Sequence, residues 1–149
     1  MAVSAKWYAA PLKGFFNGSP PFDFDTDTMK LALCTASYTP NQKTHAFFSD
    51  ITNELGTENG YTAGGLALAS CEVEQKELET RLKAANAVWT VTGSSVTARY
   101  AIVYKSTGIS STSPLAGYVD FGASMTVPGG GKFTVEWAAS GVLYAKVEP

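Results

Sequence analysis

The stretch from Val96 to Tyr104 reads VTARYAIVY and is rich in β-branched and aromatic residues. Such a run between turn signals favours a strand with at least one buried face. The second half of the chain repeats this pattern between turns at 93–94, 106–114 and 128–131, so we expect further strands at 87–91, 115–121, 132–137 and 142–147. No long helical pattern interrupts them. The sequence therefore predicts an all-β antiparallel domain, either a β-sandwich or a barrel.

The first half of the chain is less regular. Residues 28–34 predict a strand that enters the core, and a glycine-rich turn at 59–65 leads into another strand at 66–73. The connection at 37–58 is long for a compact β domain, and such connections usually carry function or cover a sheet edge. Within it, Thr44 is expected to cap one short helix that runs to Ile51.

Two smaller segments also have expected structures. The stretch from Glu74 to Lys83 alternates acidic and basic residues and is predicted to be a solvated strand or hairpin. The run Gly129-Gly130-Gly131-Lys132 is followed by Phe133 and a strand, whereas a phosphate-binding loop needs Ser or Thr and a helix at that point. We therefore expect a hairpin turn there.

The N-terminal segment is the least domain-like part of the chain. We divide the chain into an irregular arm at 1–24 and a β domain at 25–149. The arm combines prolines and glycines with many aromatic side chains, namely Trp7, Tyr8, Phe15, Phe16, Phe22 and Phe24. Aromatic residues in such number are a liability in water. The arm is expected either to pack on its own domain or to become fully ordered only on a neighbouring subunit.

Composition narrows the class of protein. The chain has 149 residues, of which 45% are hydrophobic and only 16% charged, against about 25% in a typical domain. A surface with few charges suits association with other proteins. A net charge of −2 and scattered basic residues argue against nucleic acid as a partner.

No apolar run approaches the length of about 18 residues that a membrane span requires, and no signal peptide is recognised. Synthesis in a cytoplasm is expected, with Cys34 and Cys71 as free core thiols.

The search for catalytic or metal-binding groups gives little. His45 is the only histidine, no Gly-x-Ser-x-Gly motif is present, and one histidine with two distant cysteines cannot complete a zinc site. The alternating acids Asp23, Asp25 and Asp27 resemble the start of an EF-hand loop, but the glycine and glutamate that the loop requires are absent. We expect an extended, solvated edge there, with Phe22 and Phe24 turned inward. The sequence predicts no enzyme, no cofactor and no metal.

The chain resembles a known group of small tailed-phage virion proteins. The likeness is carried by DTMKLAL at 27–33, SYTPNQKTHAFFSD at 37–50, NELG at 53–56 and NGYTAGG at 59–65. It extends through ARYAIVYK at 98–105 and SPLAGYVDFG at 113–122, and covers about 25–147. The first twenty-four residues depart from the common pattern.

The resemblance implies a capsid decoration, or cement, protein. Such a protein is a β-sandwich or jelly-roll homo-oligomer, here expected as a trimer in preference to a dimer, that binds the major capsid protein on the exterior of the virion. It binds neither nucleic acid nor membrane. Aromatic residues often dominate contact energy, so the expected contact residues are Trp7, Tyr8, Phe15, Phe16, Phe22, Phe47, Phe48 and Tyr61, although each is also compatible with ordinary core packing. The alternative is a receptor- or glycan-binding module of a head or tail fibre that uses surface aromatics such as Trp7, Tyr61 or Tyr118.

Overall fold

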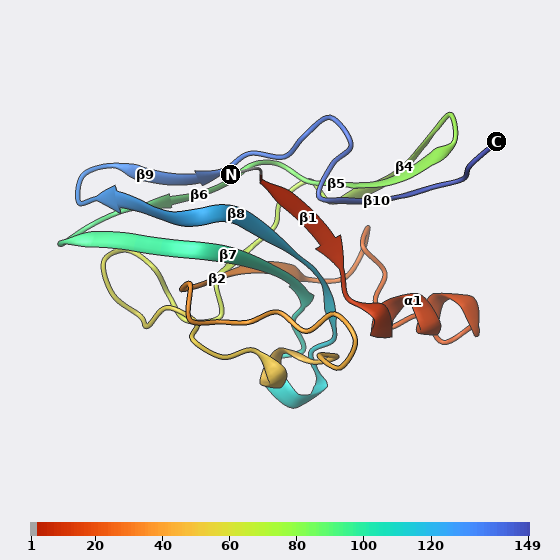
Figure 1. The fold of residues 1–149 in the computed structure, drawn as a ribbon, viewed down its shortest axis with the longest axis horizontal. Helices are drawn as coiled ribbons and strands as arrows, with labels where there is room; N and C mark the ends of the chain where they lie inside the picture. Colours follow the sequence, from red (N-terminus) through yellow and green to blue (C-terminus); the bar gives the residue numbers. More distant parts are fainter. Residues whose placement is uncertain (1–2) are drawn as a thin grey trace.

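The computed structural model describes residues 3–149 and confirms an all-β antiparallel domain (Figure 1). The largest sheet has five strands in the order β1-β8-β7-β2-β3. Its strands are β1 (Ser4–Trp7), β2 (Met29–Cys34), β3 (Leu66–Ala67), β7 (Ser95–Lys105) and β8 (Leu115–Pro128). Strand β2 lies inside this sheet and is buried along almost its whole length, which explains its nearly continuous apolar sequence.

Two smaller sheets cover one face of the large sheet. One has the order β10-β5-β4 and contains β4 (Glu72–Lys76), β5 (Glu79–Lys83) and β10 (Leu143–Lys146). The other pairs β6 (Ala87–Thr90) with β9 (Lys132–Val135). Both lie above β7 and β8 in the view of Figure 1. The main core fills the space between these layers, and Leu31, Val103 and Trp89 are among its buried residues.

The opposite face of the large sheet is covered by the long connection after β2. Tyr38, Phe48 and Ile51 pack there against a second buried cluster that includes Ile102 and Tyr104. The predicted connection thus covers a sheet face and not a sheet edge. The predicted helix is wrong in extent, because helical structure is confined to the single 3₁₀ turn η1 (Phe48–Asp50). A second 3₁₀ turn, η2 (Ser110–Thr112), lies between β7 and β8.

The N-terminal segment is more regular than predicted. Strand β1 pairs with β8, and the helix α1 (Ala9–Phe16) follows directly after Tyr8. Proline is tolerated in the first turn of a helix, so Pro11 does not prevent this start. Gly14 lets the following loop return closely, because a Cβ at this position would lie 2.7 Å from the carbonyl oxygen of Ser19. The described part of the segment therefore packs on its own domain.

Three further local predictions need correction. The predicted strand at 66–73 is broken into β3 and β4, with Ser70 at a positive φ of 53° between them. The 128–131 turn reverses the chain, but it passes β9 to a different sheet and forms no hairpin with β8. Strand β9 ends at Val135, two residues earlier than expected. By contrast, β4 and β5 do form the predicted hairpin, with Val73 opposite Leu82.

The three aspartates of the N-terminal segment lie in a turn instead of an extended edge. The backbone N–H of Asp23 donates to Asp27 at 2.7 Å, and that of Asp25 donates to Asp23 at 3.1 Å. The second bond is that of an Asx turn, and the first closes the turn from the other end. Phe22 and Phe24 point inward as expected and are buried.

Candidate protein interface

Three of the expected contact residues belong to the core of the chain. Tyr8, Phe22 and Tyr61 have exposed fractions of 0%, 3% and 1%, so they have almost no surface left for a partner. Their assignment as direct contacts is therefore corrected. Tyr8 lies between the large sheet and the long connection, where its hydroxyl shares a hydrogen bond of 2.8 Å with that of Tyr38.

Tyr61 is held by both ends of its side chain. Its ring packs in the main core near Trp89, while its hydroxyl donates to Glu54 at 2.7 Å and accepts from the backbone N–H of Leu33 at 3.0 Å. Burial, together with the neighbouring Glu54 carboxylate, raises the pKa of Tyr61 far above its ordinary value. This tyrosine joins the glycine-rich turn to β2, which is a structural role.

Phe47 and Phe48 have different surroundings although they are adjacent. Phe48 is half-buried and stacks on Tyr104, with ring centroids 4.1 Å apart. Phe47 is 42% exposed and forms an isolated β-bridge with Pro114. Phe48 therefore helps to hold the long connection on the sheet, whereas Phe47 still presents part of its ring to solvent.

The remaining expected residues lie together at one end of the molecule. Trp7, Phe15 and Phe16 line an apolar groove of about 440 Å³ between α1 and the β10-β5-β4 sheet. Phe15 contacts Phe22 edge-on, with centroids 5.1 Å apart, and Phe22 and Phe24 form the floor. Phe16 is 89% exposed at the rim. We call this surface the aromatic groove.

The opposite wall of the aromatic groove comes from the hairpin. Successive side chains of a strand point to opposite faces, and this alternation places Val73, Thr80 and Leu82 in the groove. The other face carries the charged residues, with Arg81 bonded to Glu79 at 2.7 Å. Among the described residues that line the groove, Asp23 is the one charged side chain.

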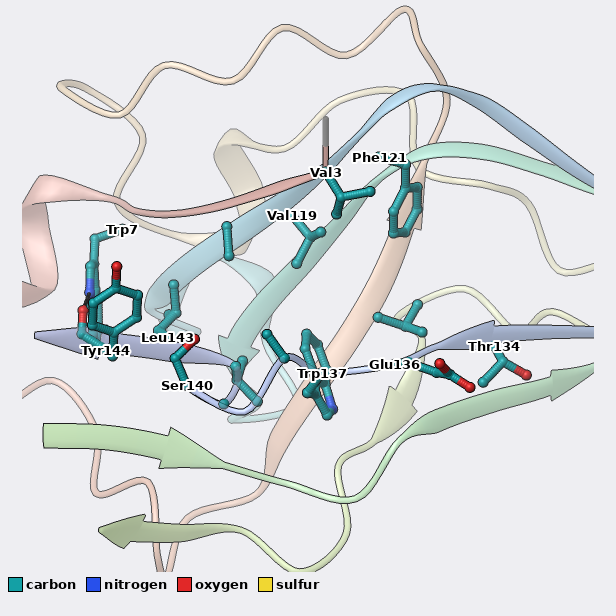
Figure 2. Close-up of a pocket in the computed structure, with 15 residues that line it drawn as sticks. Val3, Trp7, Val119, Phe121, Thr134, Glu136, Trp137, Ser140, Leu143 and Tyr144 are labelled. Carbon is teal, nitrogen blue, oxygen red and sulfur yellow. Dashed lines mark hydrogen bonds between the residues drawn. The ribbon is translucent and has the colours of Figure 1, made fainter. Parts of the chain in front are cut away.

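A second and larger cleft opens where the layers separate beside β1 (Figure 2). It has a volume of about 870 Å³ and is lined on one side by β1 and β8 and on the other by the segment at 134–144. Val3, Val119 and Phe121 lie on the first side, and Trp137 lies on the second (Figure 2). We call this the β1 cleft. Trp7 lines both surfaces, and its indole N–H donates to the carbonyl oxygen of Tyr144 at 3.0 Å.

A β-bulge contributes to the β1 cleft. Residues 121–124 of β8 lie opposite the single residue Arg99 of β7, which interrupts the ladder next to the paired residues Tyr100 and Asp120. Bulges of this kind redirect side chains at sheet edges, and Phe121 lies in the β1 cleft beside this one. The ion pair between Arg99 and Asp120, at 3.1 Å, lies next to the bulge.

Sequence reasoning missed several lining residues of these surfaces. Val73 and Trp137 lie in segments where polar and apolar residues visibly alternate. The sequence did not show which layer of the fold each face of these segments contacts. Tyr144 was placed in the last strand without a role, although its carbonyl oxygen fixes Trp7. The alternation within 72–76 and 132–137 was the available signal for Val73 and Trp137.

The groups considered for chemistry are either bonded locally or buried. His45 Nδ1 lies 2.8 Å from the Tyr38 hydroxyl, and burial raises the pKa of the Cys34 thiol to about 12. Cys34 and Cys71 are both free thiols. Within residues 3–149, no group of three or more His, Cys, Asp or Glu side chains is placed to hold a metal ion. None of the helices in this range has the length and apolar character needed to cross a membrane.

Comparisons of the chain with protein-family models, curated proteins and solved structures find no match.

Proposed function

We propose that this chain is a structural virion protein that binds the outside of a phage capsid and stabilises the shell. The observation that carries the proposal is the exposure of Phe16, at 89%, on the rim of the aromatic groove. A folded domain that leaves a large aromatic side chain in water, next to further apolar side chains, presents a surface suited to burial against another protein. The partner is the major capsid protein.

The small size of one such contact agrees with binding through several copies of the chain. Burial of one phenylalanine contributes about 1.5–3 kcal/mol, which is too little for a stable complex by itself. A homo-oligomer that bridges several capsid subunits multiplies such contacts and gains avidity. We propose a trimer in preference to a dimer, with the aromatic groove of each copy turned toward the shell.

The sequence motifs supply the setting of the proposal. The resemblance to tailed-phage virion proteins lies in 25–147, whereas α1 and the rim of the aromatic groove lie in the part that departs from the common pattern. A segment that differs from its relatives is the natural place for adaptation to one particular shell. The alternative of a glycan-binding fibre module has less support, because Tyr61 and Tyr118 are both buried.

The number of copies in purified virions tests the proposal. A decoration protein is expected at tens to hundreds of copies per particle, measured by quantitative mass spectrometry against the major capsid protein as an internal standard. A handful of copies per particle contradicts the proposal and favours the fibre alternative. Absence of the chain from purified virions contradicts both.

A further inference from the structure

The free edge of β1 and the β1 cleft beside it together form one site. Tyr8 donates its backbone N–H to Ala116 of β8. Because hydrogen-bonding direction alternates along an antiparallel strand, the backbone groups of Ser4 and Lys6 also face β8, and those of Ala5 and Trp7 face away from it. The carbonyl oxygen of Trp7 confirms this direction, since it accepts from the Gln42 side chain at 2.6 Å.

The outward edge is open to solvent. Val3, Ala5 and Lys6 are exposed, and by this alternation the backbone N–H and C=O of Ala5 point away from β8, which is the one strand that pairs with β1 among the described residues. The Gln42 side chain occupies the carbonyl oxygen of Trp7, so the open length runs from Val3 to the backbone N–H of Trp7. At about 3.4 Å per residue this length accommodates an extended segment of about five residues.

The side chains beside this edge determine which side chains a bound segment needs. Val3, Ala5 and Trp7 point into the β1 cleft, and a strand added to the edge would send every second side chain into the same space. Figure 2 shows Val3, Val119 and Phe121 facing Trp137 across this space. The intervening side chains would lie beside Lys6, which makes no ion pair within residues 3–149.

We propose that the β1 edge binds an extended segment of a partner protein by strand addition. The segment carries large apolar side chains at alternate positions, which fill the β1 cleft, and an acidic residue that faces Lys6. Backbone hydrogen bonds to Ala5 and to the N–H of Trp7 supply part of the affinity, and the cleft supplies selectivity. This inference does not depend on the capsid as the partner.

A second copy of the chain fits the site less well. If its β1 paired with this β1 about a twofold axis centred on Ala5, it would offer Val3, Ala5 and Trp7 to the cleft. Trp7 is already held by its bond to Tyr144 and lines its own cleft. Val3 and Ala5 are too small to fill a space of about 870 Å³. A partner segment with larger side chains is therefore the better occupant.

The test uses ten-residue synthetic peptides and the full chain labelled with ¹⁵N. One peptide alternates Leu with Asp and Ser, a second contains the same residues in an order that breaks the alternation, and a third replaces Asp by Lys. We expect the alternating peptide to shift the amide resonances of Ala5 and Trp7 and to slow their hydrogen exchange at least tenfold. The Lys peptide should bind several-fold more weakly. Equal binding of the alternating and reordered peptides, or no change at β1, overturns the proposal.

Variants of Ala5 locate the binding. Ala5→Pro removes the outward N–H without removing a bond to β8, which is where proline is tolerated in a strand, and should weaken peptide binding at least tenfold. Ala5→Glu keeps the N–H but places a charge in the cleft, and should weaken binding to a similar extent if the proline variant does not fold. Ala5→Ser is the matched control and should bind within twofold of the unmodified chain. Unchanged peptide binding by Ala5→Pro and Ala5→Glu overturns the proposal. It is also overturned if sedimentation velocity shows that the free chain is a dimer and that Ala5→Pro converts this dimer to monomers.

Discussion

Asp27 and Asp50 show how single carboxylates fix the loops on which the sheets depend. Asp50 accepts hydrogen bonds from the backbone N–H groups of Ala46 and Phe47, at 2.9 and 3.0 Å, and so closes the turn that carries Phe48. Asp27 accepts from the backbone N–H of Asp23 and pairs with Lys105 at 3.1 Å. These bonds favour the charged form and lower the pKa of both carboxyl groups.

The first prediction concerns acid stability. Because the folded state lowers these pKa values below the ordinary value of about 3.9, the unfolded state binds more protons in acid. The stabilisation is complete above that value and is lost as the pH falls through the lower, folded-state values. Urea unfolding between pH 7 and pH 2.5 should show this decline. Asp50→Asn should make the decline shallower and cost about 1–2 kcal/mol at pH 7. A free energy of unfolding that does not change below pH 4 would contradict the assignment.

The second prediction separates a core tyrosine from a surface one. Tyr61→Phe removes the hydroxyl that bonds both Glu54 and the backbone of Leu33 and leaves these buried polar groups without that partner, so it should cost about 1–3 kcal/mol in the free energy of unfolding. Tyr144→Phe is the control, because that side chain is about half exposed, and the substitution should change stability by less than about 0.5 kcal/mol. Equal effects of the two substitutions would show that Tyr61 has no special structural role.

At the scale of elements, the close contact between the glycine-rich turn and β2 depends on Gly65. Its φ is +76°, and a Cβ at this position would lie far inside the van der Waals contact distance from the Leu31 carbonyl oxygen. This approach lets β3 pair with β2 immediately after the turn, with Leu66 opposite Leu31. An alanine here is both strained and sterically excluded.

The third prediction follows from this contact. Gly65→Ala should destabilise the chain by about 2–4 kcal/mol, measured as a loss in the free energy of unfolding in urea. The matched control is Gly108→Ala, since Gly108 also has a positive φ of +87° but has open space around it. That substitution should cost only about 1 kcal/mol. A control that costs as much as Gly65→Ala would rule out the steric explanation.

An element could be predicted where its own residues carry a pattern of burial or charge. The β-branched run of β7, the first half of β8 and the charged hairpin of β4 and β5 were visible, because their patterns report burial directly. The second half of β8, at 122–128, was not predicted as a strand. Helix α1 was missed because it has eight residues, contains Pro11 and Gly14, and has no side-chain cap. The break at Ser70 was missed because a positive φ in a serine leaves no mark in the sequence.

At the scale of the whole molecule, the arrangement of layers decides which aromatic residues are free. Tyr61 is buried in a glycine-rich turn that looks exposed in sequence, because that turn packs on β2 and near Trp89. Phe16 is exposed because α1 extends beyond the large sheet, beside the β10-β5-β4 sheet (Figure 1). The composition predicted a surface for association, but only the packing of the layers shows which aromatic residues remain exposed and which belong to the core.

The fourth prediction tests the central proposal, that the aromatic groove docks on the capsid. Purified particles that lack this protein are titrated with the chain, and bound copies per particle are measured after sedimentation. The variant is Phe16→Ser, and the matched control is Met125→Ser, a half-exposed apolar residue on the part of β8 away from α1 (Figure 1). Neither variant should shift the midpoint of thermal unfolding by more than about 2–3 °C.

We expect Phe16→Ser to weaken binding to these particles at least tenfold, and Met125→Ser to bind like the unmodified chain. Docking through the aromatic groove is contradicted if the particles take up Phe16→Ser as well as the unmodified chain, or if both variants lose binding to the same extent.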